Sequence, residues 1–114
     1  MTDPTPLASL SASLADLVAR TAPALISVHS HRSRGSGFVW KSGLIVTADE
    51  ALADEGEVSI KLGDGTEHKA AFAGRDHTTD IALLRVDAKS IAPIKLVQAV
   101  PPLGSLAVVV AAEG

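Results

Sequence analysis

The hydrophobic positions change their spacing near Pro23, from a helical period to a period of two. Before that point, large apolar residues recur every three or four positions and form one face of a helix. They are Leu7, Leu10, Leu14, Leu17 and Val18. Thr5 can cap this helix with Pro6 at its first position, and Pro23 ends it. We therefore expect a helix over residues 7–22 after a loose N-terminus at residues 1–6. Its apolar face is expected to pack on the fold, with docking of a partner as the alternative.

After Pro23 the alternation of apolar and polar residues predicts a series of short strands. The expected strands are 25–31, 36–40, 44–48, 57–62, 67–74, 80–86, 92–97 and 105–112. Asp64 and Gly65 stand between two alternating runs and give the strongest hairpin signal in the chain. Many short strands separated by turn residues indicate an all-β antiparallel barrel or sandwich.

The last apolar run, from Leu106 to Ala112, is apolar on both faces. This pattern predicts a strand that is buried on both sides. If such a run were left uncovered, it would favour self-association or contact with a protein or peptide partner.

Composition narrows the possible functions. The 114 residues suit one domain, and the net charge of -3 gives no electrostatic reason to expect nucleic acid or an anionic membrane as a partner. Aromatic residues make up only 3%, which argues against a base-stacking surface. The absence of cysteine excludes disulfides and thiolate metal sites, and no apolar run is long enough to span a membrane. The N-terminal sequence MTDPTPLAS has no basic region typical of a signal peptide.

Two motifs carry a family resemblance. The first is GSGFVWKSGLIVTADEAL, from Gly35 to Leu52, and the second is TDIALL, from Thr79 to Leu84. In order and spacing they resemble the first half of an HtrA-type, trypsin-fold serine protease. The resemblance implies a six-stranded antiparallel barrel, the N-terminal subdomain of that fold, over residues 24–114 with a leading helix. It implies a periplasmic or other envelope location.

The resemblance also assigns positions in the catalytic triad. Asp80 matches the triad Asp, whereas Glu50 occupies the position of the His that acts as general base. A carboxylate is a much weaker base than imidazole at neutral pH. The chain also carries no segment resembling the nucleophile loop, so we expect no catalysis by this chain as written. The chain would then be a pseudoprotease or N-terminal fragment that acts through protein or peptide binding.

Alternatives at these two positions stay open. Glu50 can be an exposed acid in a short helical turn, and the Asp80 carboxylate can accept backbone amides at the start of a strand. In that case Asp80 is a vestige of the triad. A further alternative is half of a working endopeptidase whose Ser comes from a second barrel.

Three other residues invite functional interpretations. Ser36 lies in a Gly-Ser-Gly sequence but lacks the strand–turn–helix context of a nucleophile, and the resemblance places it in a hairpin strand. His29 and His31 are two apart on an expected strand and would share one face. They are candidate zinc or copper ligands if folding brings a third ligand to them. Otherwise we expect no cofactor.

Overall fold

The computed structural model describes residues 5–31, 33–53, 56–87 and 91–112. The expected loose N-terminus therefore lies largely outside the described residues. The elements in order are α1 (Pro6–Thr21), η1 (Ala22–Ala24), β1 (Leu25–Ser30), β2 (Ser33–Lys41), β3 (Leu44–Ala48), η2 (Asp49–Ala51), β4 (Val58–Lys61), β5 (Glu67–Asp76) and β6 (Ile81–Val86).

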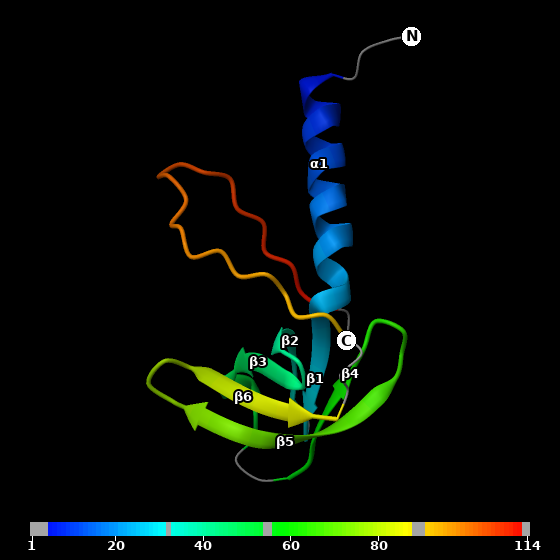
Figure 1. Cartoon of the computed structure of the whole chain (residues 1–114), viewed down its shortest axis with the longest axis vertical. Helices are drawn as coiled ribbons and strands as arrows, with labels where there is room; N and C mark the ends of the chain where they lie inside the picture. The colour runs from blue at the N-terminus through cyan, green and yellow to red at the C-terminus, as the bar shows by residue number, and fades with distance from the viewer. Residues whose placement is uncertain (1–4, 32, 54–55, 88–90, 113–114) are drawn as a thin grey trace.

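The six strands form one closed antiparallel barrel in the order β1-β2-β3-β6-β5-β4 (Figure 1). Closure comes from the pairing of β1 with β4, in which Val28 lies opposite Ile60. The predicted all-β, six-stranded antiparallel fold with a leading helix is confirmed. The barrel interior is filled by alternate residues of the strands, which explains the period of two in the sequence. The buried core consists of Ile26, Val28, Val39, Ile45, Leu52, Val58, Ile60, Ala82, Leu84 and Val86.

Turn residues set the hairpins. Between β4 and β5, Gly65 has a φ of 90°, a conformation that favours glycine, and the Asp64 carboxylate accepts the Thr66 amide at 2.8 Å. Between β2 and β3, Gly43 has a φ of 76°, and its carbonyl accepts the Val86 amide at 2.9 Å. Both turns fall where the sequence predicted them.

The helix α1 begins one residue earlier than predicted. The Thr5 hydroxyl accepts the Ala8 amide at 3.1 Å, and Pro6 occupies the first turn. The expectation that the apolar face packs on the fold is wrong. No residue of α1, all of which the structure describes, is buried, and Leu7 is 76% exposed. The reason is geometric: α1 projects away from the barrel along the longest axis of the molecule (Figure 1).

The predicted strands at 92–97 and 105–112 are absent from the described residues. Each segment runs as irregular chain. Because the barrel closes on itself, no strand edge is open to accept either segment. Hydrogen bonds to β2 tie the described parts of both segments to the barrel instead: the Ile94 amide donates to the Val39 carbonyl at 2.8 Å, and the Ala112 amide donates to the Ser36 hydroxyl at 2.9 Å.

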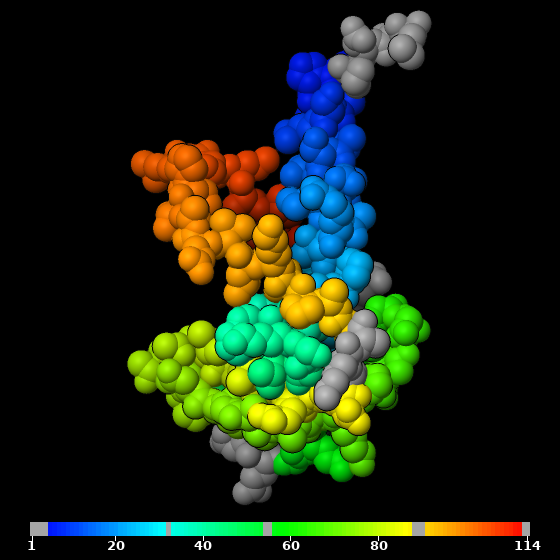
Figure 2. Space-filling view, viewed as in Figure 1, coloured from blue at the N-terminus to red at the C-terminus, as the bar shows by residue number. Residues whose placement is uncertain are grey.

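The expected burial of the last apolar run on both faces is also wrong. Leu106 is 70% exposed and Val109 is 96% exposed. Residues 91–112 leave the barrel, loop outward and return towards the base of α1 (Figure 1). In the space-filling view this segment and the helix rise from the same side of the barrel (Figure 2). Among the described residues, no helix has the length and apolar character needed to cross a membrane.

Candidate functional site

Pairing of β3 with β6 brings Glu50 and Asp80 together. Ala48 lies opposite Ile81 at the end of this ladder, so η2 follows β3 directly beside the residue that precedes β6. The Asp80 carbonyl accepts the Asp49 amide at 3.0 Å, and its carboxylate Oδ1 accepts the Glu50 amide at 2.8 Å. The motifs that are 30 residues apart in the sequence therefore meet at one end of the barrel.

Asp80 holds an uncommon backbone conformation. Its φ is 59°, in the left-handed region, where short polar residues are tolerated better than others. The side chain accepts a backbone amide, which is the alternative that the sequence left open for a turn carboxylate. Glu50 sits in the middle of η2, and its side chain is exposed. A carboxylate, and no imidazole, thus occupies position 50 next to Asp80.

A second carboxylate beside this pair is buried, and sequence reasoning missed it. Asp49 keeps only 4% of its side chain exposed, and its Oδ1 accepts the Arg75 Nε–H at 2.6 Å. The His77 Nδ1 contacts the other oxygen, Oδ2. The Arg75 guanidinium holds the pKa of the Asp49 carboxyl below its ordinary value of 3.8, against the opposing effect of burial, and His77 acts in the same direction. Asp49 is therefore ionised at neutral pH.

Arg75 ties this carboxylate to the chain that follows η2. Its NH1 donates to the Ala53 carbonyl at 3.2 Å, and its NH2 lies 3.4 Å from the carbonyl oxygens of Asp49 and Leu52. A guanidinium with several carbonyl partners and one carboxylate is fixed in orientation. The side chain of Asp49 is held rigidly as a result.

The signal for Asp49 was present in the sequence. Ile45, Thr47 and Asp49 alternate, and all three are buried. The inward-facing alternation of β3 thus extends to Asp49, the first residue of η2. A buried acid requires a partner that balances its charge, and Arg75, whose side chain is 19% exposed, supplies one.

The other candidate residues lie apart from this site. Ser36 is in β2, where its carbonyl accepts the Thr47 hydroxyl at 2.9 Å. His29 is in β1, with its Nε2 3.0 Å from the Ser27 hydroxyl, whereas His31 follows the strand with a φ of 52° and is exposed. Within the described ranges, no group of three or more His, Asp or Glu side chains is placed to hold a metal ion.

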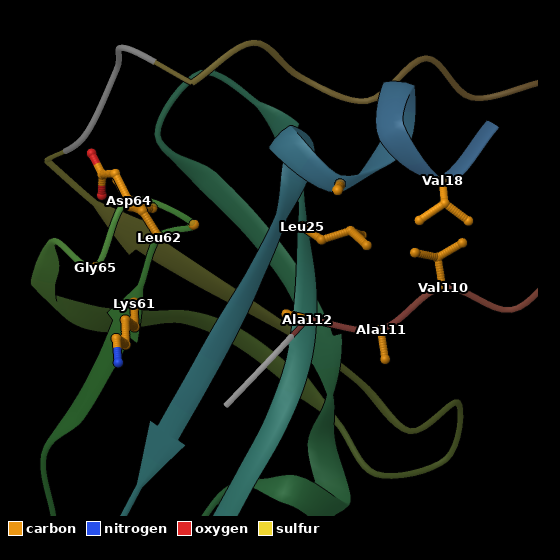
Figure 3. A pocket seen from close by; sticks show the side chains of 11 residues that line it. Val18, Leu25, Lys61, Leu62, Asp64, Gly65, Val110, Ala111 and Ala112 are labelled. Carbon is orange, nitrogen blue, oxygen red and sulfur yellow. The ribbon is translucent and has the colours of Figure 1, made fainter. Parts of the chain in front are cut away.

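A cavity of about 870 Å³ lies at the opposite junction, between α1 and the barrel. It is bounded by the end of the helix, the β4–β5 turn and the returning chain near residue 112 (Figure 3). The side chains of Val18 and Val110 face each other across one end of it (Figure 3). A second cavity of about 1030 Å³, on the same side, has Leu17, Pro23 and Ile94 among its apolar lining residues. Asp49, Glu50 and Asp80 are not among the residues that line either of these two cavities.

Comparison with known proteins identifies the barrel. A profile of the trypsin-like peptidase domain matches residues 35–114. A probable periplasmic serine endoprotease DegP-like protein of Pseudomonas putida is 41% identical over 66 residues, covering 57% of this chain and 14% of the relative. The serine protease HTRA1B of Danio rerio is 34% identical over 94 residues, covering 73% of this chain and 20% of the relative.

A solved structure agrees with these matches. The crystal structure of the serine endoprotease from Yersinia pestis superposes with a TM-score of 0.71 at 29% identity, covering 76% of this chain and 34% of that one. The chain spans a minor part of the length of all these relatives. On the profile match and the shared closed barrel, the chain belongs to the trypsin-like peptidase domain family, with HtrA-type serine proteases among its relatives.

Proposed function

We propose that this chain is a catalytically incomplete protease barrel, a pseudoprotease or N-terminal fragment that acts through protein or peptide binding. One observation carries the proposal: the Glu50 amide is held 2.8 Å from Asp80 Oδ1, at the position that the family resemblance gives to the base. A catalytic triad needs an imidazole there to accept the proton of the serine and return it to the leaving group. A glutamate beside an aspartate supplies only a second negative charge.

The proposal is tested on the full-length protein from its natural source with a serine-directed fluorophosphonate probe. We expect no labelling, because an unactivated serine does not react with the probe. The matched variant is Glu50→His in the same protein. Because the side chain at position 50 is exposed, we expect this substitution to leave the fold intact. Labelling of the unaltered protein would overturn the proposal.

A second candidate rests on Asp80. The family resemblance matches its carboxylate to the orienting acid of a triad, and that carboxylate lies 2.8 Å from the Glu50 amide, which supports a chain that is half of a working endopeptidase whose Ser comes from a second barrel. Labelling that is absent in the natural protein and appears in Glu50→His supports a lost base in an otherwise complete site. Absence of labelling in both proteins supports a site that lacks the nucleophile as well.

The binding role is supported by apolar surface. Apart from Phe72 and Ile81, the large hydrophobic side chains that are exposed among the described residues all lie on α1 or on residues 96–109. Two cavities adjoin these segments. Concentrated apolar surface of this kind is typical of protein interaction sites.

A further inference from the structure

The contact between Asp49 and His77 has the form of a carboxylate–imidazole pair. Asp49 is ionised and can only accept hydrogen bonds, so the His77 Nδ1 that contacts its Oδ2 must carry a proton. In the neutral ring this leaves Nε2 without a proton and with a free lone pair. The carboxylate therefore selects one tautomer of the imidazole.

The two partners are exposed to very different degrees. The side chain of Asp49 is 4% exposed, and Arg75 fixes it from the other side. The side chain of His77 is 75% exposed. A buried, rigid acid thus contacts one ring nitrogen of a largely exposed imidazole, which is the relation between acid and base in a triad.

The pair lies beside the position that lacks a base. Asp49 adjoins Glu50 in η2, and His77 precedes Asp80 by three residues in the turn between β5 and β6. The turn is itself braced, because the Asp76 carboxylate accepts the Thr78 amide at 2.9 Å. Neither residue belongs to the triad positions of the family, so this imidazole is additional to the site described above.

We propose that His77, oriented by Asp49, is an acyl-transfer site for activated esters. The Nε2 lone pair attacks the ester carbonyl carbon, the bond from that carbon to the leaving oxygen breaks, and the acyl group is left on Nε2. The Nδ1 proton stays hydrogen-bonded to the Asp49 carboxylate, so the intermediate is an acylimidazolium. Water next attacks the acyl carbon, and the carbon–Nε2 bond breaks with its electron pair returning to Nε2. The carboxylic acid departs, and one proton from the water is released to solvent. His77 is the catalytic residue, and Asp49 is a positioning residue.

The activity is tested on the present chain with p-nitrophenyl acetate. We expect His77→Asn to lower the rate of p-nitrophenolate release by on the order of tenfold, below the roughly 10²–10⁴-fold typical of a positioned acid or base because nothing else orients this substrate. The matched control is His31→Asn, which removes another exposed imidazole and suits the left-handed backbone at that position. The control should retain nearly the whole rate. Equal rates in the two variants would overturn the proposal.

Positioning by Asp49 is tested through the ring nitrogens. In the unaltered chain, ¹⁵N NMR of the neutral ring should show His77 protonated at Nδ1 and unprotonated at Nε2. Asp49→Asn should shift the ring towards the opposite tautomer and lower the esterase rate, and circular dichroism reports whether this variant folds. An unaltered chain with the proton on Nε2 overturns the proposal even if the variant unfolds.

This test is independent of the proposed function. The fluorophosphonate experiment reports on a serine in the full-length protein, whereas ester hydrolysis reports on an imidazole in this chain. Loss of either result leaves the other interpretable.

Discussion

At the scale of single residues, Asp49 couples stability to pH. Arg75 above all, with help from His77, holds the pKa of its carboxyl below 3.8 in the folded state. Because folding lowers this pKa, the stabilisation is complete above the pKa of the unfolded carboxyl and is lost as the pH falls through the folded value. We expect Asp49→Asn to lower the thermal midpoint at neutral pH and to flatten its decline between about pH 5 and pH 2.

The control for this prediction is Asp64→Asn. The pKa of Asp64 is also lowered, mainly by its hydrogen bond with Thr66, so this variant removes another titrating carboxylate. An asparagine oxygen can still accept the Thr66 amide, which keeps the turn intact. We expect the thermal midpoint of unfolding of Asp64→Asn to fall less steeply in acid than that of the unaltered chain. At neutral pH we expect its midpoint to be little changed. An acid decline that is unchanged in Asp49→Asn would show that the Arg75 pair contributes nothing to the pH dependence.

The residue scale also separates what the sequence predicts from what it leaves hidden. The family resemblance placed Glu50 beside Asp80, and in the structure the Glu50 amide lies 2.8 Å from Asp80 Oδ1. Asp49 contacts Arg75 and His77, which lie 26 and 28 positions further along the chain. The local sequence does not predict these contacts, because they depend on the register between β5 and β6. The neighbouring Glu50 is exposed, whereas the period of β3 turns Asp49 inward.

At the scale of elements, close approach of three strands depends on Gly37. A Cβ added there would lie 2.9 Å from the Val46 carbonyl oxygen, 3.1 Å from an Ile45 methyl and 3.2 Å from a Val28 methyl. The backbone oxygen belongs to the β2–β3 ladder and cannot move aside easily. We therefore expect Gly37→Ala to lower the free energy of unfolding by about 1–3 kcal/mol, measured by urea denaturation.

Gly63→Ala is the matched control for Gly37→Ala. No atom lies within 4 Å of the Cβ that this substitution would add, and its backbone conformation is open to other residues. The added methyl restricts the unfolded chain, so we expect no loss or a gain of up to about 1 kcal/mol. Similar losses of unfolding free energy in both variants would mean that the close approach of the strands at Gly37 does not account for the loss.

Elements inside the barrel were predictable because each has a neighbour that satisfies its backbone. The alternation in 25–31 and 44–48 became β1 and β3 within one residue. The apolar runs at 92–97 and 105–112 have comparable strand propensity, but a closed barrel offers them no edge. Strand propensity is thus expressed only where a partner strand exists, and periodicity alone cannot supply that information.

At the scale of the whole molecule, apolar surface is distributed unevenly. Apart from Phe72 and Ile81, the exposed large hydrophobic side chains of the described residues lie on α1 and residues 96–109, which rise from one side of the barrel (Figure 2). An exposed helix of 16 residues gains little stability from its own hydrogen bonds in water. Burial of the apolar face of α1 against another surface would stabilise the helix and that surface. Burial of the exposed apolar side chains of residues 96–109 would have the same effect.

We therefore expect this chain to associate as its concentration rises, which sedimentation velocity or light scattering measures directly. Replacing both Leu106 and Val109 by Ser should shift the equilibrium towards monomer, because these side chains are 70% and 96% exposed and contribute apolar area rather than core packing. The matched variant replaces Leu7 and Leu10 by Ser on α1.

The two variants distinguish which segment forms the contact between copies. If only the Leu106 and Val109 variant dissociates, residues 96–109 form the contact. If only the Leu7 and Leu10 variant dissociates, α1 forms it. A strict monomer at all concentrations would contradict the prediction, since the apolar side would then be stable in water without a partner.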